Sequence, residues 1–383
     1  MNLPCRHTRR RVLATLAAAG CGLRATGADA ADAPATGASF AAGDAFYPPV
    51  VRGEPLKFPR DHGAHPPFRT EWWYLTGWLR RLDGDRRGQP LGVQVTFFRS
   101  RTRHDAANPS RFAPTQLLLA HAALALPEHG RLVHAQRAAR AGFGLASASG
   151  DDTALTVDGW SLARDPADRY HARIDDRRFA LELDAAAHAP PVLQGDAGFS
   201  RKGPREQQAS FYYSRPQLRT AGVIRIDGAH ATVEGLAWLD HEWSSEILDA
   251  AADGWDWTGL NLDDGSALVA FRIRLRDGGV AWSYARWSTA DGAASAGNDS
   301  AVRFVPARHW TSPRTGARYP VAMRLELGAR TLVLEPLFDD QELDTRASTG
   351  TIYWEGAVRA FEGGREVGRG YLELTGYAGA LRL

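Results

Sequence analysis

The chain has 383 residues, of which 44% are hydrophobic and 23% charged, as in a soluble globular protein long enough for two domains. Its formal net charge of +2 is too small to indicate binding to nucleic acid, so we expect no nucleic-acid partner. Cys5 and Cys21 are the only cysteines, so no disulfide or thiolate chemistry is expected once the amino terminus is removed.

The first 30 residues predict an export signal of the twin-arginine type. Arg9 and Arg10 precede an apolar run over 12–23, and Ala28-Asp29-Ala30 offers a cleavage site. We therefore expect a periplasmic protein that begins near Ala31. The apolar run is too short to span a bilayer, and we expect no transmembrane segment. In an alternative interpretation Cys21 lies in a weak lipobox and carries a lipid anchor.

Residues 31–48 are rich in Ala, Gly and Pro and predict a linker. Beyond them, short segments with strand periodicity recur between Asp, Gly and Pro turns, and no long segment has a helical period. Strands are expected at 72–79, 91–99, 116–126, 153–162, 170–174, 178–183, 211–216 and 222–226. In the second half they are expected at 255–262, 267–275, 281–287, 303–306, 323–327, 330–334, 351–361 and 370–377.

This pattern predicts an all-β fold of two antiparallel units. We place the boundary near residue 245, giving domains over 49–245 and 246–383. Gly235 and Gly259 fall inside strand patterns, where they mark bulges or close packing.

The stretch 235–265 concentrates tryptophans and ionisable residues on both sides of that boundary. With period two, His241 and Trp243 share a strand face with Val233, Ala237 and Leu239, while Leu236, Trp238, Asp240 and Glu242 share the other. Carboxyl and imidazole groups among tryptophans have shifted pKa values, which suits a catalytic or binding site. The same pattern is expected where polar residues hydrogen-bond across the junction between two domains.

Five motifs together resemble the AttH/CrtC-like family, and they extend over residues 62–377. They are HPPFRTEWWYLTGWL, FYYSRP, GLAWLDHEWSSE, GWDWTGLNLDDGSALVAFRIR and YWEGAVRAF with GRGYLELTGY. The resemblance implies two tandem lipocalin-like barrels. One branch of the family resembles carotenoid 1,2-hydratase (hydroxyneurosporene synthase), a lyase that adds water to acyclic carotenoids without a cofactor. Other branches are exported proteins, often associated with ABC transporter permeases.

Hydration of an alkene needs a carboxylic acid to protonate carbon, aromatic faces beside the cation and a base for the attacking water. Asp240, His241, Trp243 and Asp256 are the candidate catalytic residues, and the resemblance matches His241 and Trp243 to the hydratase motif. The candidate ligand-binding residues are Glu71, Trp73, Tyr213, Glu242, Trp255 and Trp257.

Glu71 has a second interpretation, as a structural carboxylate paired with an arginine such as Arg69. His62 and His65, with Asp61 beside them, have a spacing that can bind metal, but the loop offers no further clear ligands. We therefore expect neither a metal nor a cofactor.

Two functions stay open. The first is an exported protein that binds a lipophilic, isoprenoid-like or lipid-like molecule, with ABC permease components as possible partners. The second is a hydratase-like enzyme acting on an acyclic carotenoid or terpenoid. Both predict an apolar pocket with few polar groups.

Overall fold

The computed structural model describes residues 47–104, 108–110, 112–292 and 301–380. The predicted export signal, both cysteines and all but the last two residues of the predicted linker lie outside these ranges. Within the described residues, no helix has the length and apolar character that crossing a membrane requires.

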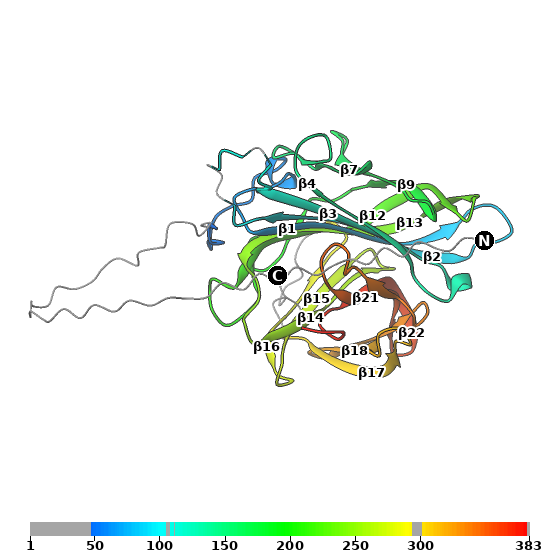
Figure 1. Ribbon diagram of the computed structural model, residues 1–383. Helices are drawn as coiled ribbons and strands as arrows, with labels where there is room; N and C mark the ends of the chain where they lie inside the picture. Colours follow the sequence, from blue (N-terminus) through cyan, green and yellow to red (C-terminus); the bar gives the residue numbers. More distant parts are fainter. Residues whose placement is uncertain (1–46, 105–107, 111, 293–300, 381–383) are drawn as a thin grey trace, which may run out of the picture. The chain divides into compact units, whose positions relative to one another are not determined.

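The first sheet has 13 antiparallel strands, and their order is β4-β3-β2-β1-β13-β12-β9-β8-β7-β6-β5, with β10 and β11 paired to β12. Because β3 and β4 also contact β6, the sheet curls into a nearly closed barrel (Figure 1). The strands are β1 (Thr70–Arg81), β2 (Pro90–Arg101), β3 (Gln116–Ala125), β4 (Val133–Arg140), β5 (Ala146–Ala148), β6 (Ala154–Val157), β7 (Trp160–Arg164), β8 (Arg169–Asp175), β9 (Phe179–Ala186), β10 (Val192–Leu193), β11 (Phe199–Arg201), β12 (Ala209–Ile226) and β13 (Ala229–Glu246).

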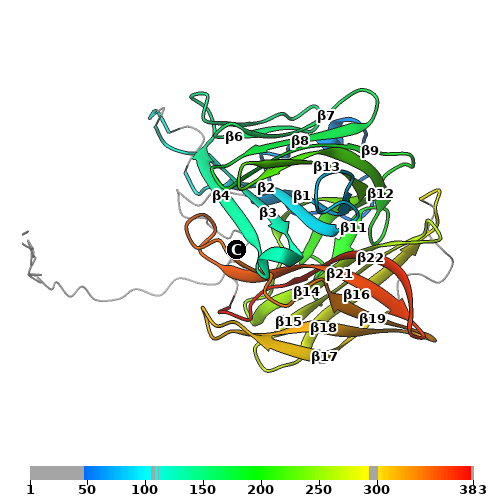
Figure 2. The ribbon, with the colours of Figure 1, turned by 90° about the vertical axis from the view of Figure 1, so that its right-hand side faces the viewer.

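The second sheet has nine antiparallel strands in the order β16-β15-β14-β22-β21-β19-β18-β17, with β20 paired to β21. It forms a half-barrel whose edge strands are β16 and β17 (Figure 2). The strands are β14 (Ala252–Leu262), β15 (Ala267–Leu275), β16 (Val280–Ser288), β17 (Arg303–Thr311), β18 (Arg318–Leu327), β19 (Arg330–Pro336), β20 (Glu342–Asp344), β21 (Ile352–Glu362) and β22 (Arg365–Leu374).

The predicted all-β fold of two antiparallel units is confirmed. The described residues contain only two short 3₁₀ helices, η1 (Arg60–His62) and η2 (Pro127–His129). The single strand predicted over 153–162 is wrong, because Asp158 and Gly159 adopt positive φ and turn the chain between β6 and β7. The two strands predicted over 211–226 are one continuous β12, in which a bulge between Arg215 and Leu218 accommodates the proline.

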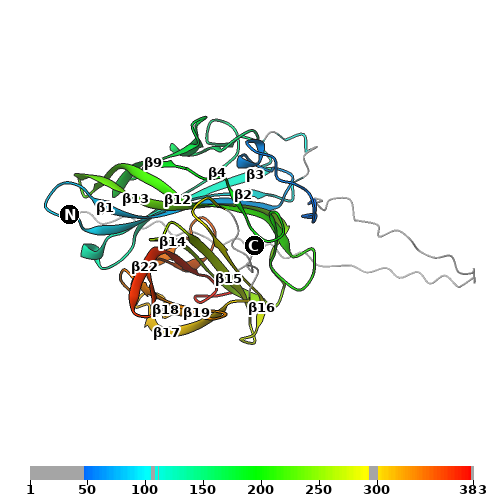
Figure 3. The ribbon, with the colours of Figure 1, turned by 180° about the vertical axis from the view of Figure 1, so that it is seen from behind.

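Three apolar clusters organise the packing. One fills the first barrel, one covers the inner face of the half-barrel, and the third lies between the two sheets. The third cluster includes Tyr74, Trp238, Trp257 and Tyr353, which come from β1, β13, β14 and β21. Figure 3 shows β1, β12 and β13 running across β14 and β22. The strand pair β1–β13 is therefore buried on both faces.

Candidate functional site

The whole of β1 pairs in register with β13, with Glu71 opposite Trp243, Trp73 opposite His241 and Tyr74 opposite Asp240. Because side chains alternate along a strand, Trp73, His241 and Trp243 point into the first barrel, where the two tryptophans are part of the apolar core and His241 is buried against them. Their neighbours in sequence point toward the second sheet. The predicted site residues on these strands therefore divide into two groups on opposite faces.

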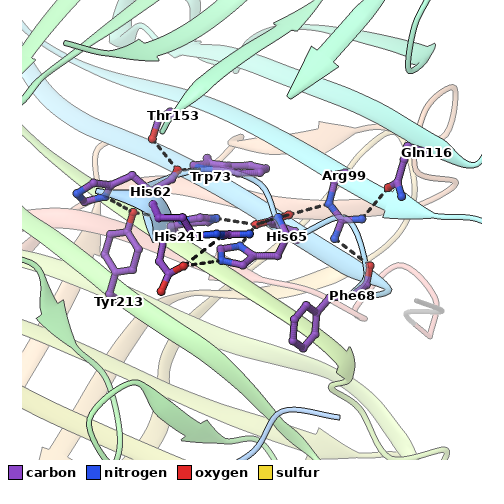
Figure 4. A network of polar contacts seen from close by, with 12 residues as sticks. His62, His65, Phe68, Trp73, Arg99, Gln116, Thr153, Tyr213 and His241 are labelled. Atoms are coloured by element: carbon purple, nitrogen blue, oxygen red, sulfur yellow. Dashed lines mark hydrogen bonds and ion pairs between the residues drawn. The ribbon is translucent and has the colours of Figure 1, made fainter. Parts of the chain in front are cut away.

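A buried polar network surrounds Glu71 inside the barrel (Figure 4). Its Oε1 accepts hydrogen bonds from His65 Nδ1 at 2.7 Å and His241 Nε2 at 2.9 Å, and its Oε2 accepts one from Arg99 Nε at 2.7 Å. Burial alone would raise the pKa of Glu71. The hydrogen bonds from His241 and His65, together with the charge of Arg99, outweigh burial and hold this pKa far below its usual range. Glu71 is therefore an ionised, fully paired carboxylate.

Burial decides the protonation of His62 and His241, and for His241 it outweighs the opposing charge of Glu71. Burial lowers the pKa of His241 to about 4 and that of His62 to about 3, so both rings are neutral near pH 7. With its Nε2 proton directed at Glu71, His241 offers Nδ1 as acceptor to the Tyr213 hydroxyl at 3.2 Å. The same hydroxyl then accepts from His62 Nδ1 at 2.7 Å (Figure 4). Each of these donors has a partner.

Aromatic stacking locks the same residues in place. The His65 ring lies parallel to Trp243 with centroids 3.7 Å apart, and His241 stacks on Trp73 at 4.4 Å. The Trp73 indole also donates to the His62 carbonyl at 3.1 Å. These contacts fix the segment around η1 against the barrel wall, which is the structural role that the sequence left open for these residues.

His65, Glu71 and His241 bring three possible metal-ligand atoms within 4.8 Å of one another. The carboxylate oxygens of Glu71 are already hydrogen-bonded, and a divalent cation would lie beside the buried guanidinium of Arg99. Asp61, which the sequence also suggested, contacts the other ring nitrogen of His65 at 3.2 Å. The geometry is that of a hydrogen-bonded network.

The interpretation of Glu71 as a carboxylate paired with an arginine is confirmed, but the arginine is Arg99 on β2, its register partner, and not the Arg69 that the sequence suggested. The expectation that Asp256 shares a site with His241 is wrong, because Asp256 lies on the half-barrel face of β14. There it accepts hydrogen bonds from Arg272 at 2.7 Å, Arg274 at 3.1 Å and Tyr377 at 3.0 Å.

A cavity of about 100 Å³ lies on the opposite face of β1 and β13, between the two sheets. Seven of the 16 residues that line it are aromatic and come from both sheets, and four carboxyl groups and one lysine lie among them. The lining residues are Thr70, Trp72, Tyr74, Thr96, Phe98, Lys202, Asp240, Glu242, Ile247, Trp255, Trp257, Phe271, Ile273, Tyr353, Glu355 and Glu373.

Asp240 is the most deeply buried acid contributed by the first sheet to this cavity wall. Its carboxylate accepts hydrogen bonds from the Tyr212 hydroxyl at 2.6 Å, the Ser214 hydroxyl at 2.5 Å and the Trp238 indole at 2.7 Å. Burial raises the pKa of Asp240, the three donors lower it and the nearby Glu242 raises it, with a net value of about 7. The group can therefore exchange a proton near neutral pH.

The second sheet contributes two acids that lie opposite each other, Glu355 on β21 and Glu373 on β22. Burial, followed by the charge of Glu373, raises the pKa of Glu355 well above its usual range. Burial raises the pKa of Glu373 to about 7, although a hydrogen bond with Trp255 opposes it. Tyr74 donates to Glu355 Oε1, whereas Glu355 Oε2 is buried with no hydrogen-bond partner within the described part of the chain. That oxygen is available to a ligand.

Lys202 supplies the cation of this cavity. Its ammonium lies 2.9 Å from Glu242 Oε1 and over the rings of Phe271 and Tyr212, at 4.0 and 4.6 Å from their centroids. Burial lowers the pKa of Lys202, and the charge of Glu242 opposes the shift. One of the four carboxyl groups is thus neutralised by an ion pair, and the other three depend on protonation.

The cavity adjoins a surface groove of about 260 Å³. Thr70 and Ile247 line both spaces, and Arg69 and the segment 245–250 line the groove. This groove is the route by which a molecule could reach the cavity from solvent.

Of the predicted site residues, the structure brings Asp240, Glu242, Trp255 and Trp257 to the cavity. It places His241, Trp243, Glu71, Trp73 and Tyr213 in the barrel network. The sequence interpretation missed Lys202, Glu355 and Glu373 as site residues. The signal for the last two was present, because both lie in the quoted motifs YWEGAVRAF and GYLELTGY beside large aromatic residues.

Comparison with known proteins agrees with this architecture. The model of the AttH-like family matches residues 49–377. A crystal structure of a protein assigned to AttH in Nitrosomonas europaea is 49% identical in sequence, covers 86% of this chain and 99% of its own, and superposes with a TM-score of 0.80. Kievitone hydratase from Nectria haematococca is 13% identical over 88% of this chain and 97% of its own, with a TM-score of 0.62. No curated protein matches the chain.

Proposed function

This chain belongs to the AttH-like family, and from that premise and the cavity between its sheets we propose that it binds the apolar end of a lipophilic molecule there. The aromatic walls supply the apolar contact, and the acids and Lys202 are the few polar groups that orient a ligand. A free volume of about 100 Å³ suits one end of a molecule whose remainder extends into the adjoining groove of about 260 Å³.

We further propose that the cavity transfers protons, as a hydratase or lyase without a cofactor. The observation that carries this proposal is the carboxyl of Asp240, wholly buried in an aromatic wall with a pKa of about 7. Burial of three acids without a cationic partner in one apolar cavity destabilises a fold. A role in proton transfer therefore accounts for these acids better than packing does. The distant likeness to a hydratase shows a shared fold and is compatible with this proposal.

The proposed reaction is the hydration of a trisubstituted carbon–carbon double bond. Asp240 gives its proton to the less substituted carbon, and the positive charge develops on the other carbon beside aromatic faces such as that of Trp257. Water then attacks that carbon and gives a proton to the ionised carboxylate of Glu373 in the opposite sheet. Alkene and water form a tertiary alcohol, and one proton has moved from the first sheet to the second.

Binding is tested with the neutral probe N-phenyl-1-naphthylamine. We expect its fluorescence to rise on binding and an acyclic carotenoid or terpenoid to displace it. Ile273→Trp, which fills the cavity, should abolish the signal, whereas Val223→Trp at an exposed position of β12 should not. Equal binding by both variants would place the ligand elsewhere.

Proton transfer is tested by incubating the displacing ligand with protein in D2O and measuring deuterium on carbon by mass spectrometry. Asp240→Asn keeps the size of the side chain and an acceptor oxygen but removes the acid. Deuterium incorporation should therefore fall by ~100-fold or more while probe binding persists. If the parent protein incorporates no deuterium but binds the ligand, the chain is a binding protein and the catalytic proposal is wrong. Export to the periplasm and association with an ABC permease stay predictions from the sequence.

A further inference from the structure

A row of hydrogen-bonded side chains joins the cavity between the sheets to a separate cleft on the protein surface. Tyr353 lines the cavity, and its hydroxyl lies 2.9 Å from Nδ1 of His121. The other ring nitrogen of His121 lies 2.8 Å from the hydroxyl of Ser348, which donates to Gln136 Oε1 at 2.6 Å. Gln136 lines the cleft, which has a volume of about 910 Å³. We call Tyr353, His121, Ser348 and Gln136 the polar row.

The polar row lies where the first sheet meets the loop between β20 and β21. His121 on β3 and Gln136 on β4 are register partners, so their side chains share one face of the first sheet. His121 is fully buried beside Phe98 of the cavity wall, with ring centroids 5.0 Å apart. Ser348 is only partly buried and follows Ala347, which also lines the cleft. The row therefore begins in the cavity wall and ends at residues that water can reach.

All hydrogen bonds of the polar row have the same direction. The Ser348 hydroxyl has one proton, and its acceptor is Gln136 Oε1 or the Thr345 carbonyl at 3.2 Å. That proton is not available to His121, so His121 donates to Ser348 from Nε2. Burial lowers the pKa of His121 to about 3, so the ring is neutral and Nδ1 accepts from the Tyr353 hydroxyl. Each proton in the row is thus directed from the cavity toward the cleft.

The cavity end of the row lies among the acids of the second sheet. Tyr353 and Glu355 are two residues apart on one face of β21, and Glu373 on β22 lies opposite Glu355. Burial, followed by the charges of Glu355 and Glu373, raises the pKa of Tyr353 well above its usual range. The cavity of about 100 Å³ has room for water beside these groups. The polar row and the two acids therefore border one shared space.

We propose that the polar row transfers protons between the cavity acids and solvent in the cleft. This inference rests on the proposed function, in which each hydration leaves one proton on Glu373. A water in the cavity passes that proton to the Tyr353 hydroxyl as Tyr353 gives its own proton to His121 Nδ1. His121 gives its Nε2 proton to Ser348, and Ser348 gives its proton to water in the cleft. One proton enters the row and one leaves, and His121 changes from one neutral tautomer to the other.

A separate proton path suits a cavity that a lipophilic ligand fills. The groove that leads to the cavity and the cleft at the end of the polar row have no lining residue in common. A ligand that occupies the cavity and the groove therefore leaves the cleft open to water. In the reverse direction the row brings a proton into the cavity, where Asp240 needs one before the next reaction.

The test measures how fast the cavity acids exchange protons with solvent, in the full chain and without any ligand. After rapid mixing from about pH 5 to about pH 8, the infrared C=O band of each protonated carboxyl disappears as the acid ionises, and Glu373→Gln identifies the band of Glu373. Ser348→Val replaces the hydroxyl with methyl groups, which leave no space for a water in its place. We expect this variant to slow the loss of the Glu373 band by about tenfold or more.

Ser348→Thr is the matched control, because threonine has nearly the shape of valine but keeps the hydroxyl, so its rate should equal that of the parent. His134→Ala, at a histidine that lines the cleft outside the polar row, should also leave the rate unchanged. Equal rates for Ser348→Val and Ser348→Thr would overturn the proposal, even if the valine variant has a lower melting temperature, because a purely structural hydrogen bond gives that result. Binding of N-phenyl-1-naphthylamine should be the same in the parent and these three variants, and deuterium incorporation tests the proposed function separately.

Discussion

At the scale of single residues, the two faces of the β1–β13 pair differ in whether a buried carboxylate has charged or neutral hydrogen-bond partners. Glu71 is ionised because Arg99 and two imidazoles surround it. Asp240, which faces the other way from the same strand pair, has neutral donors as its closest partners, so burial decides its pKa. The acid with a charged partner stabilises the fold, and the acid without one is suited to proton exchange.

Glu71→Gln tests whether the ion pair of Glu71 with Arg99 stabilises the fold. The substitution leaves the buried guanidinium of Arg99 without its counter-charge, and we expect the free energy of unfolding in urea to fall by ~3–5 kcal/mol. Glu182→Gln removes one partner of an exposed pair with Arg173 and should change it by less than ~0.5 kcal/mol. A loss as small as that of the control would show that water reaches Arg99. Under conditions where the variant is folded, binding of N-phenyl-1-naphthylamine should be unchanged.

At the scale of strands, alternation accounts for much of what the sequence predicted. It placed His241 and Asp240 on opposite faces of one strand, and the structure has them so. It did not predict β4, whose sequence VHAQRAAR has one β-branched residue and no aromatic, and which pairs with only one neighbour at the end of the sheet.

The partners in the site depend on long-range packing that periodicity does not encode. Strand period gives the face of Glu355 and Glu373, but only the packing of β22 against β1 and of β21 against β1 and β2 brings that face to Asp240. For the same reason the sequence offered Arg69, near in the chain, as the partner of Glu71 in place of Arg99. The alternation of side chains along a strand predicts which face each side chain occupies, but not which residues of other strands lie close to it.

Gly259 on β14 shows how closely the two sheets approach. A Cβ there would lie 2.7 Å from the Trp257 ring and 2.9 Å from the Trp238 ring, so close packing explains this glycine and a bulge does not. We expect Gly259→Ala to lower the free energy of unfolding by ~1–3 kcal/mol and to weaken probe binding, since Trp257 lines the cavity. Gly150→Ala, where the nearest atom is 3.8 Å from the new Cβ, is the control. Equal stability of the two variants would mean that the tryptophans move apart at little cost.

At the scale of the whole molecule, the cavity acids make stability depend on pH. An acid whose pKa is raised to about 7 on folding stabilises the folded state at low pH, and this contribution is lost as the pH rises through 7. In Asp240→Asn that loss is absent. Between pH 5 and pH 8 the unfolding free energy of this variant, relative to the parent, should therefore rise by about 3 kcal/mol.

The measurement is urea unfolding of both proteins at several pH values. Burial of His62 and His241 lowers their pKa values, so both proteins lose stability as the pH falls below the usual histidine range, and the difference between them removes this shared contribution. A difference that does not vary with pH would show that Asp240 stays ionised in the folded protein. The catalytic proposal would then lose its acid.

The edge strand β17 of the half-barrel is built in a way that disfavours self-association. An exposed edge strand offers unpaired backbone groups to a strand of another molecule. In β17 the ladder is interrupted by two register shifts, between Pro306 and Arg308 and between Arg308 and Trp310. Proline lacks a backbone N–H to donate to another strand, and Arg303 and Arg308 place charged, ion-paired side chains along this edge. The β17 edge is thus a poor template for the growth of an intermolecular sheet, even in a concentrated solution.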